Sequence, residues 1–251
     1  MHQVQIYQND ETLVEAVCHF ASYQLQPTEA VIIVVTDTHL AAIEARLTAQ
    51  GIDLERAMRN AQYNFIDAEL LIASLTGSGE FDFARAESDF RKLLEGLLQA
   101  YRHVRVYGET VDLLWQRGEK QNAKALEALW NRLLERYSLS VLCTYRMDNL
   151  DPAAYNGDIE CLCSTHTHFL PSQDPALLEQ ALAVASENVM GVSLTGMMKS
   201  IAKFPHPTTI MPASQASLLY ISKTMPVTTE VILNQVRAHL ADQNPPSRRN
   251  A

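Results

Sequence analysis

Residues 30–36 read AVIIVVT, a continuous run of apolar and β-branched side chains. Such a run is typical of a strand in a parallel sheet, because helices cover both faces and neither face meets water. It therefore predicts a central strand. Asp37 or Thr38 then offers an N-cap, and the helix that follows has apolar side chains at helical spacing and ends at Gly51.

Strand and helix patterns alternate on both sides of this run. Further short strands are predicted at residues 3–7, 63–66, 103–107 and 138–145. Amphipathic stretches of helical period separate them. Strands that alternate with helices indicate βαβ units with right-handed crossovers. The sequence therefore predicts a three-layer α/β fold, in which a mostly parallel sheet has helices on both faces.

The pattern changes after Asp151. Residues 152–174 are predicted to be irregular, with Cys161 and Cys163 on one strand, and helices punctuated by proline follow, the first over 176–202. We expect an α/β domain over residues 1–174, a helical appendage over 175–251, and a flexible tail from about residue 243.

Composition and charge exclude several classes of protein. The 251 residues are 47% hydrophobic and 20% charged, and the net charge is −9. A nucleic-acid surface needs clustered basic charge, so direct nucleic-acid binding is not expected. No apolar run approaches the roughly 20 residues that span a bilayer, and the N-terminus lacks a signal peptide. We therefore expect a cytoplasmic protein with no membrane contact.

The loop after the central strand lacks the chemistry of a nucleotide site. A phosphate-binding loop needs glycines, whose backbone N–H groups cradle the phosphates, and a lysine that reaches the terminal phosphate. Residues 34–43 read VVTDTHLAAI, without glycine or lysine. ATP hydrolysis by that mechanism is not expected, and the sequence predicts no cofactor. The Gly-x-Ser-x-Gly elbow of serine hydrolases is absent as well.

Polar residues at the carboxyl ends of the predicted strands are the candidate ligand-binding groups, because open parallel sheets bind ligands there. These residues are Asn9, Asp10, Asp37, His39, Asp67, Glu109 and Tyr145. Asp10 can equally cap a helix, and His39 can be a solvated residue of a first helical turn. Asp67 and Glu109 would raise each other's pKa if they converged on one crevice. Helix capping is the alternative for both.

Two further groups of residues have two interpretations each. Cys161, Cys163, His166 and His168 can supply four zinc ligands, although their spacing is unusual, and an edge strand with a loop is the alternative. Methionines of the appendage predict a docking or dimer surface, because methionine adapts to irregular partners; an internal helix–helix core is the alternative. These are Met190, Met197, Met198, Met211 and Met225.

Seven short motifs, in this order and spacing, resemble the MEDS (methanogen/methylotroph sensory) domain over about residues 2–150. They are His2 with Tyr7-Gln8-Asn9-Asp10 and Leu13; Thr28-Glu29-Ala30 before VIIVVT and His39; Gly51 with Asp53-Leu54; Tyr63 with Ile66-Asp67-Ala68; Val104 to Glu109; Leu114-Trp115; and Leu126-Glu127 with Leu129-Trp130-Asn131 before SLSVLCTY. The sequence departs from the family pattern around Gln24 to Gln26 and at Tyr145-Arg146-Met147. The resemblance implies a RecA/KaiC-like core without ATPase residues, and a role in sensing small hydrocarbon derivatives or related metabolites in prokaryotic signalling.

These observations predict a non-enzymatic sensory module that binds a small molecule or a protein partner and signals through its C-terminal helices. The expected partner is another signalling protein or a second copy of the chain. Two alternatives stay open. One is a divergent nucleotide-binding or metal-dependent enzyme, and the other is a scaffold that has lost ligand binding.

Overall fold

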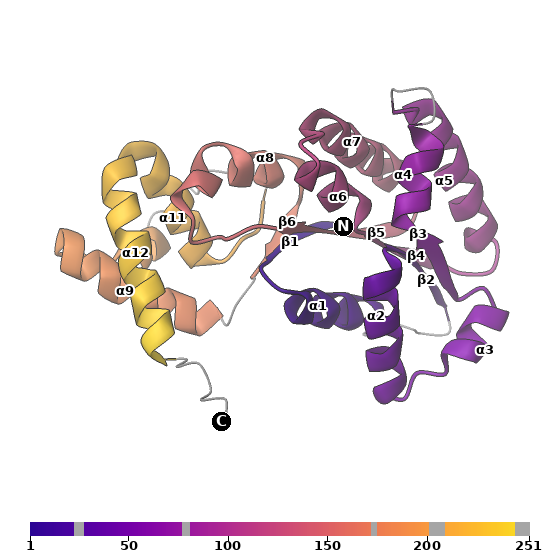
Figure 1. Ribbon diagram of the computed structural model, residues 1–251, viewed down its shortest axis with the longest axis horizontal. Coiled ribbons are helices and arrows are strands. Elements are labelled where there is room, and N and C mark those ends of the chain that lie inside the picture. Colours follow the sequence, from indigo (N-terminus) through magenta and orange to yellow (C-terminus); the bar gives the residue numbers. More distant parts are fainter. Residues whose placement is uncertain (23–27, 77–80, 172–174, 201–208, 244–251) are drawn as a thin grey trace. The chain divides into compact units, whose positions relative to one another are not determined.

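The computed structural model describes residues 1–22, 28–76, 81–171, 175–200 and 209–243 (Figure 1). The chain forms two compact units, Met1–Arg146 and Met147–Ala251. The first unit ends with the last strand of its sheet, whereas the predicted α/β domain extended to residue 174. The predicted flexible tail lies almost wholly in residues 244–251, outside the described residues.

The first unit is built on a parallel sheet. Its five described strands lie in the order β3-β2-β4-β5-β1. They are β1 (His2–Tyr7), β2 (Glu29–Val35), β3 (Tyr63–Asp67), β4 (His103–Gly108) and β5 (Leu139–Arg146). The stretch that predicted a central strand is β2, which lies between β3 and β4 with every side chain from Ala30 to Val35 buried. The predicted parallel α/β fold is confirmed.

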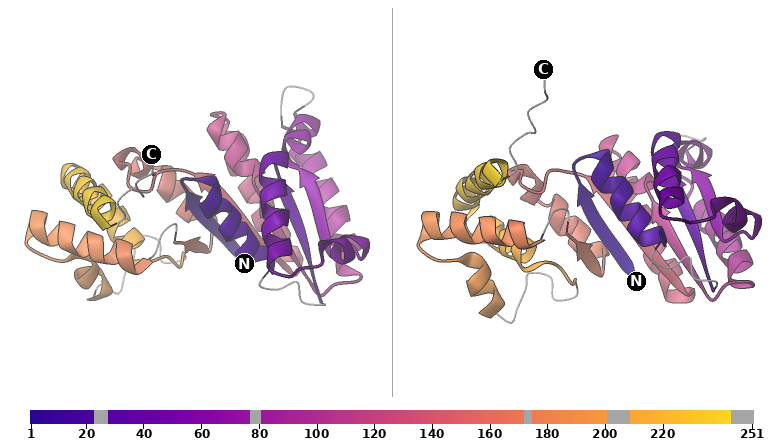
Figure 2. Two further views of the ribbon diagram at one scale, coloured as in Figure 1. Left: turned by 60° about the horizontal axis from the view of Figure 1, so that its bottom comes forward. Right: turned by 90° about the horizontal axis from the view of Figure 1, so that it is seen from below.

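Helices cover both faces of this sheet. They are α1 (Asp10–Ser22), α2 (Asp37–Ala49), α3 (Leu54–Arg59), α4 (Ala68–Leu75), α5 (Phe83–Leu98), α6 (Thr110–Gln116) and α7 (Lys120–Arg136). Helices α1 and α2 pack together on one face, and α5, α6 and α7 lie on the other (Figure 1 and Figure 2). The Trp130 ring of α7 lies 4.6 Å from the Phe90 ring of α5, which joins these two helices in the core.

The second unit is mainly helical. It contains the 3₁₀ helix η1 (Pro152–Tyr155), α8 (Asp158–Thr165), the short strand β6 (His168–Leu170), α9 (Pro175–Met190), α10 (Leu194–Ser200), α11 (Ala213–Thr224) and α12 (Pro226–Gln243). Helix α9 packs against α12, and α10 packs against α11. The single helix predicted over 176–202 is interrupted at Gly191, whose φ of 73° is left-handed and ends α9.

The strand predicted through Cys161 and Cys163 is wrong, because these residues lie in α8. The helix begins after Gly157, which adopts a φ of 109° that a residue with a side chain would resist. Residues two apart on a helix point about 200° apart, so the two thiols do not share a face as they would on a strand.

No helix within the described ranges combines the length and the apolar character that crossing a membrane requires.

The two-sided burial of the sheet predicts a sharp contrast between two leucines of the first unit. Leu47 on α2 is fully buried, whereas Leu70 on α4 is 70% exposed. We expect Leu47→Ala to lower the free energy of unfolding by about 2–5 kcal/mol, because it leaves a cavity. The control Leu70→Ala should change it by less than about 0.5 kcal/mol. Urea unfolding of both variants measures the difference, and equal losses would contradict the described packing.

Candidate functional site

The carboxyl ends of β2 and β4 meet at the buried carboxylate of Glu109. Gly108 of β4 pairs with Val34 of β2, so the next residue, Glu109, lies beside the end of β2. Its Oε2 accepts hydrogen bonds from the backbone N–H of Thr36 at 2.9 Å and from the Thr36 hydroxyl at 3.2 Å. Only 2% of Glu109 is exposed. Donors at the strand end therefore compensate the buried charge.

His39, on the first turn of α2, connects Glu109 to a second carboxylate. Its Nδ1 lies 2.8 Å from Glu109 Oε1, and its Nε2 lies 3.6 Å from Asp10 Oδ1. The hydrogen bond to Glu109 raises the pKa of His39 above its ordinary value of 6.5; burial opposes this shift, and the charges of Glu109 and Asp10 reinforce it. The two carboxylates therefore favour the protonated imidazolium.

Asp10 and Arg146 extend this chain of contacts to solvent. The Asp10 carboxylate pairs with the guanidinium of Arg146, the last residue of β5. The same guanidinium lies over the ring of Tyr7, 5.4 Å from its centroid. The side chains of Asp10 and Arg146 are 57% and 48% exposed. A molecule in solution can therefore reach Asp10 and Arg146, whereas it cannot reach Glu109.

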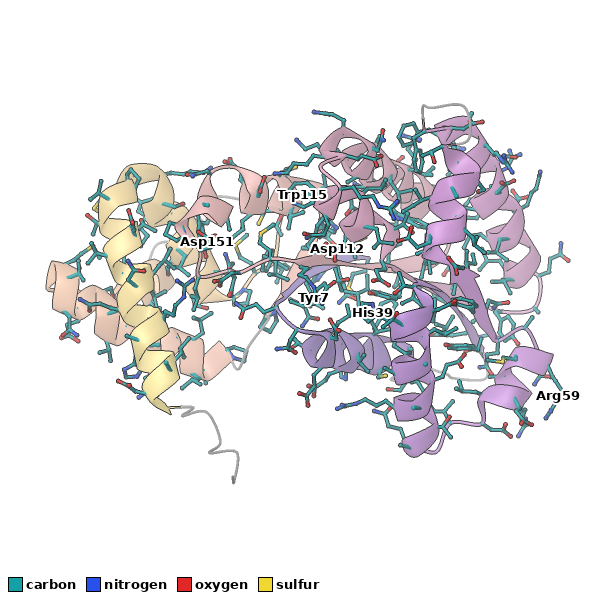
Figure 3. The ribbon with its side chains drawn as sticks, in the orientation of Figure 1. Tyr7, His39, Arg59, Asp112, Trp115 and Asp151 are labelled. Atoms are coloured by element: carbon teal, nitrogen blue, oxygen red, sulfur yellow. The ribbon has the colours of Figure 1, made fainter. Side chains whose placement is uncertain are left out.

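Asp112 of α6 is connected to the same group of side chains through Tyr7 and Arg146. Its Oδ2 accepts a 2.6 Å hydrogen bond from the Tyr7 hydroxyl, and its Oδ1 accepts from the backbone N–H of Arg146 and from Gln116 Nε2, both at 3.0 Å. Burial raises the pKa of Asp112, while these hydrogen bonds lower it. Figure 3 labels Tyr7, His39 and Asp112 of this set. We call the connected residues the edge network: Tyr7, Asp10, Thr36, His39, Glu109, Asp112 and Arg146.

The structure brings three of the predicted residues together, since Asp10, His39 and Glu109 all belong to the edge network. Other predicted residues have a different position. Asn9 accepts a hydrogen bond from the backbone N–H of Thr12 and so caps α1. Asp67 accepts from the backbone N–H of Leu70 and caps α4, which is the capping alternative for that residue. Asp37 is exposed in the first turn of α2. The ligand-binding role of all seven residues stays a prediction.

Tyr145 lies on the opposite side of β5 from this solvent-facing edge. Its hydroxyl donates a 2.6 Å hydrogen bond to Glu127 of α7, and its ring meets Trp115 edge-on at 5.3 Å. Only 1% of Tyr145 is exposed. Tyr145 therefore joins a buried cluster under α7 and not the edge network.

Sequence reasoning assigned no role to Tyr7 and Asp112, although both belong to the edge network. Tyr7 is the last residue of β1, so the same strand-end rule could have selected it. Asp112 lies on α6, a helix of 7 residues that the sequence pattern did not predict.

The residues of the alternative zinc site do not come together as one set of ligands. Cys161 and Cys163 lie on α8 and His168 lies on β6; among the described residues, these three belong to no cluster of metal-ligating side chains. His166 Nδ1 lies 2.8 Å from the carbonyl oxygen of Leu162. Burial raises the pKa of Cys163 to about 12, so its thiol stays protonated near neutral pH.

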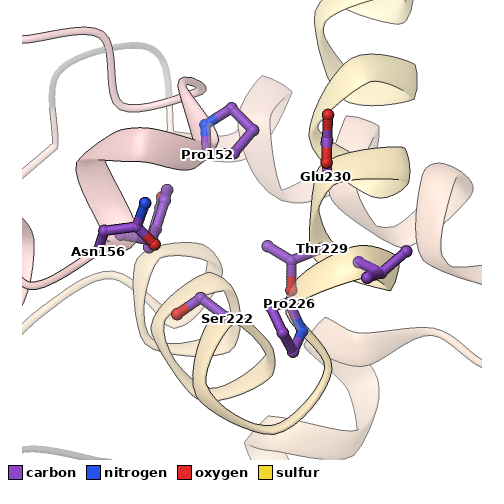
Figure 4. Close-up of a pocket in the computed structure, with 8 residues that line it drawn as sticks. Pro152, Asn156, Ser222, Pro226, Thr229 and Glu230 are labelled. Carbon is purple, nitrogen blue, oxygen red and sulfur yellow. The ribbon is translucent and has the colours of Figure 1, made fainter.

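The second unit carries exposed apolar side chains and a small cavity. Met197 and Met225 are 38% and 37% exposed, and Met190 and Met211 are half-buried; the side chain of Met198 lies outside the described part. The cavity has a volume of about 210 Å³ and lies between η1, α11 and the start of α12 (Figure 4). Its lining is Pro152, Tyr155, Asn156, Ser222, Pro226, Val227, Thr229 and Glu230.

The first unit is thus a parallel α/β domain whose strand ends hold a network of charged side chains in place of a phosphate-binding loop. Residues 1–167 match the family model described as MEthanogen/methylotroph, DcmR Sensory domain. The chain belongs to this MEDS family of sensory domains, which confirms the resemblance found in the sequence.

Other comparisons add little to this assignment. No curated protein matches the chain. Among solved structures, PCH-2 of C. elegans matches with 14% sequence identity over 94% of this chain and 71% of that chain, at a TM-score of 0.28. Such a low TM-score supports no inference about function.

The edge network predicts a pH-dependent stability with a defined sign. Because the pKa of His39 is raised in the folded protein, the folded state binds this proton more tightly than the unfolded chain. The stabilisation is complete below about pH 6.5 and is lost as the pH rises through the folded pKa. Urea unfolding over this range should show the loss, and His39→Gln should remove it.

His103 provides an internal reference of opposite sign. Its pKa is lowered, mainly by burial. In an NMR titration of the imidazole signals, His39 should titrate above 6.5 and His103 below it. A midpoint for His39 at or below that value would refute the described contact with Glu109.

Proposed function

We propose that the first unit senses a small polar molecule at the edge network and that this role is non-enzymatic. Membership of a sensory domain family supports the general role. The observation that carries the specific proposal is the position of His39, which connects the buried carboxylate of Glu109 to the half-exposed carboxylate of Asp10. A ligand that contacts Asp10 in solvent would thereby act on a group inside the protein.

The contacts of the edge network define what a ligand would change. Asp10 pairs with Arg146 in the free protein, so a ligand with a charged or hydrogen-bonding head competes for one of these two side chains. Loss of the Asp10 charge weakens one of the interactions that raise the pKa of His39. His39 and Thr36 share the Glu109 carboxylate, and Thr36 is the N-cap residue of α2. The proposed signal therefore reaches the N-terminus of α2.

The family description points to organisms that metabolise one-carbon compounds. We therefore choose methylamine, methanol and formate as probes, since they present a cationic, a neutral and an anionic head on the smallest carbon skeleton. At least one of them should shift the amide NMR signals of Thr36 and Arg146 in a saturable manner. Asp10→Asn should weaken the binding of methylamine or methanol about tenfold or more, because hydrogen bonds to charged groups contribute roughly 1.5–3 kcal/mol.

Asp53→Asn is the matched control for this experiment. Asp53 caps α3 through Arg56 N, outside the edge network, and asparagine caps helices equally well. This variant should bind like the wild type. The proposal fails if none of the three probes perturbs Thr36 or Arg146, or if both aspartate variants lose binding equally.

For the output of the sensor, we propose that the helices of the second unit associate with a second copy of the chain. The proposal is based on the exposed apolar side chains near the junction of α11 and α12. Met225 is 37% exposed and Val227 is 76% exposed. Exposed apolar side chains favour association, since water is released when they are covered.

A charge at this position should disrupt the association. We expect Met225→Glu to shift the protein toward monomer in sedimentation velocity runs across a dilution series, because burial of an unpaired carboxylate is costly. Met58→Glu is the control, since Met58 is 45% exposed on α3 of the first unit. A wild type that is monomeric throughout would refute self-association and leave a different signalling protein as the partner to test.

A further inference from the structure

A second set of polar side chains is buried under α7, away from the edge network. Residues of a strand alternate between its two faces, so Val141, Cys143 and Tyr145 of β5 share one face. His2 of β1 pairs with Val141 and so points to that face as well. Helix α7 covers it with Glu127, which is 2% exposed; His2 is 1% exposed and Cys143 is fully buried.

Three potential metal ligands of this set form a compact triangle. His2 Nε2 lies 3.1 Å from Glu127 Oε2, Cys143 Sγ lies 3.3 Å from the same oxygen, and Cys143 Sγ lies 3.5 Å from His2 Nε2. Around a tetrahedral zinc ion with ordinary bond lengths, ligand nitrogen and oxygen atoms lie about 3.3 Å apart, and a ligand sulfur lies about 3.5 Å from either. The three atoms thus have the spacing of one face of a zinc tetrahedron.

The surrounding contacts orient these groups as the outer shell of a metal site does. His2 directs Nε2 into the triangle, while its Nδ1 lies 2.9 Å from Asn131 Oδ1. Glu127 contributes Oε2 to the triangle, while its Oε1 accepts the 2.6 Å hydrogen bond from Tyr145. Metal-binding histidines and carboxylates are typically held in this way through their second nitrogen or oxygen.

Charge balance also fits a divalent cation. A neutral imidazole, a carboxylate and a thiolate carry two negative charges together, which a zinc ion neutralises in the buried site. Zinc replaces the thiol proton of Cys143, and that proton leaves to solvent. The set of one nitrogen, one oxygen and one sulfur donor suits zinc among the common divalent metals.

We propose that His2, Glu127 and Cys143 bind a zinc ion that links β1, β5 and α7, with Asn131 and Tyr145 as positioning residues. The three ligands leave the fourth tetrahedral position for a donor that they do not supply. This inference goes beyond the sensing role and departs from the sequence-based prediction that the protein needs no cofactor.

The test uses the full chain purified from zinc-supplemented medium. Elemental analysis should find roughly one zinc per chain. After chelation, addition of Co²⁺ should produce the visible bands of tetrahedral cobalt and a thiolate-to-cobalt charge-transfer band. Cys143→Ser should lose the charge-transfer band, whereas Cys18→Ser, at another fully buried cysteine, should keep it. Circular dichroism confirms that each variant is folded.

Two further variants separate metal binding from a purely structural role. Asn131→Ala should keep the cobalt bands but weaken zinc affinity by roughly 10–100-fold, as expected for an outer-shell partner. Glu127→Gln removes a proposed ligand and should weaken zinc affinity more strongly than Asn131→Ala does. Its zinc affinity is the test if Cys143→Ser does not fold. The proposal is overturned if the wild type contains no zinc and gives no cobalt bands. It is equally overturned if Cys143→Ser keeps the charge-transfer band, and neither result affects the proposed binding of small molecules at Asp10.

Discussion

The burial of the Glu109 carboxylate is the constraint on which the carboxyl edge of the sheet depends. An isolated charge at such a depth costs several kcal/mol, so the structure must bring donors to it. The parallel register of β2 and β4 places the N–H of Thr36 there, and the first turn of α2 supplies His39. The second ring nitrogen of His39 in turn faces the carboxylate of Asp10. The arrangement of the strand ends thus follows from one carboxylate that must be compensated.

The edge of the sheet differs in kind from that of a phosphate-binding α/β protein. There, backbone N–H groups of a glycine-rich loop face a negative ligand. Here, the N–H at the end of β2 donates to a carboxylate of the protein itself. A phosphate placed at this position would meet Glu109 in competition for the same donor. The absence of glycine and lysine from residues 34–43 therefore agrees with an internal acceptor that takes the place of the phosphate.

The sequence predicted those features that leave a local pattern. A strand buried on both faces needs a continuous apolar run, so residues 30–36 identified the centre of the sheet. The strand-end rule selected Asp10, His39 and Glu109 from order alone. It could not predict which of the selected carboxylates caps a helix, because Asp67 and Glu109 both follow strands. Cys161 and Cys163 were misplaced, since an 8-residue segment shows too little of either period to distinguish helix from strand. The triangle of His2, Glu127 and Cys143 leaves no local pattern, because its members are far apart in the chain, and the register of β1 and β5 together with the packing of α7 brings them together.

The end of β5 connects the two polar clusters of the first unit. Its alternating side chains direct Cys143 and Tyr145 toward α7, while Arg146 contributes its guanidinium to Asp10 and its backbone N–H to Asp112. Tyr145 and Arg146 are consecutive, so a displacement of Arg146 acts directly on the residue whose hydroxyl holds Glu127. A ligand that competes for Arg146 thus acts on a strand that Glu127 anchors on its other face. In the proposed sensing role, the hydrogen bond from Tyr145 to Glu127 therefore holds the strand next to the residue for which a ligand would compete.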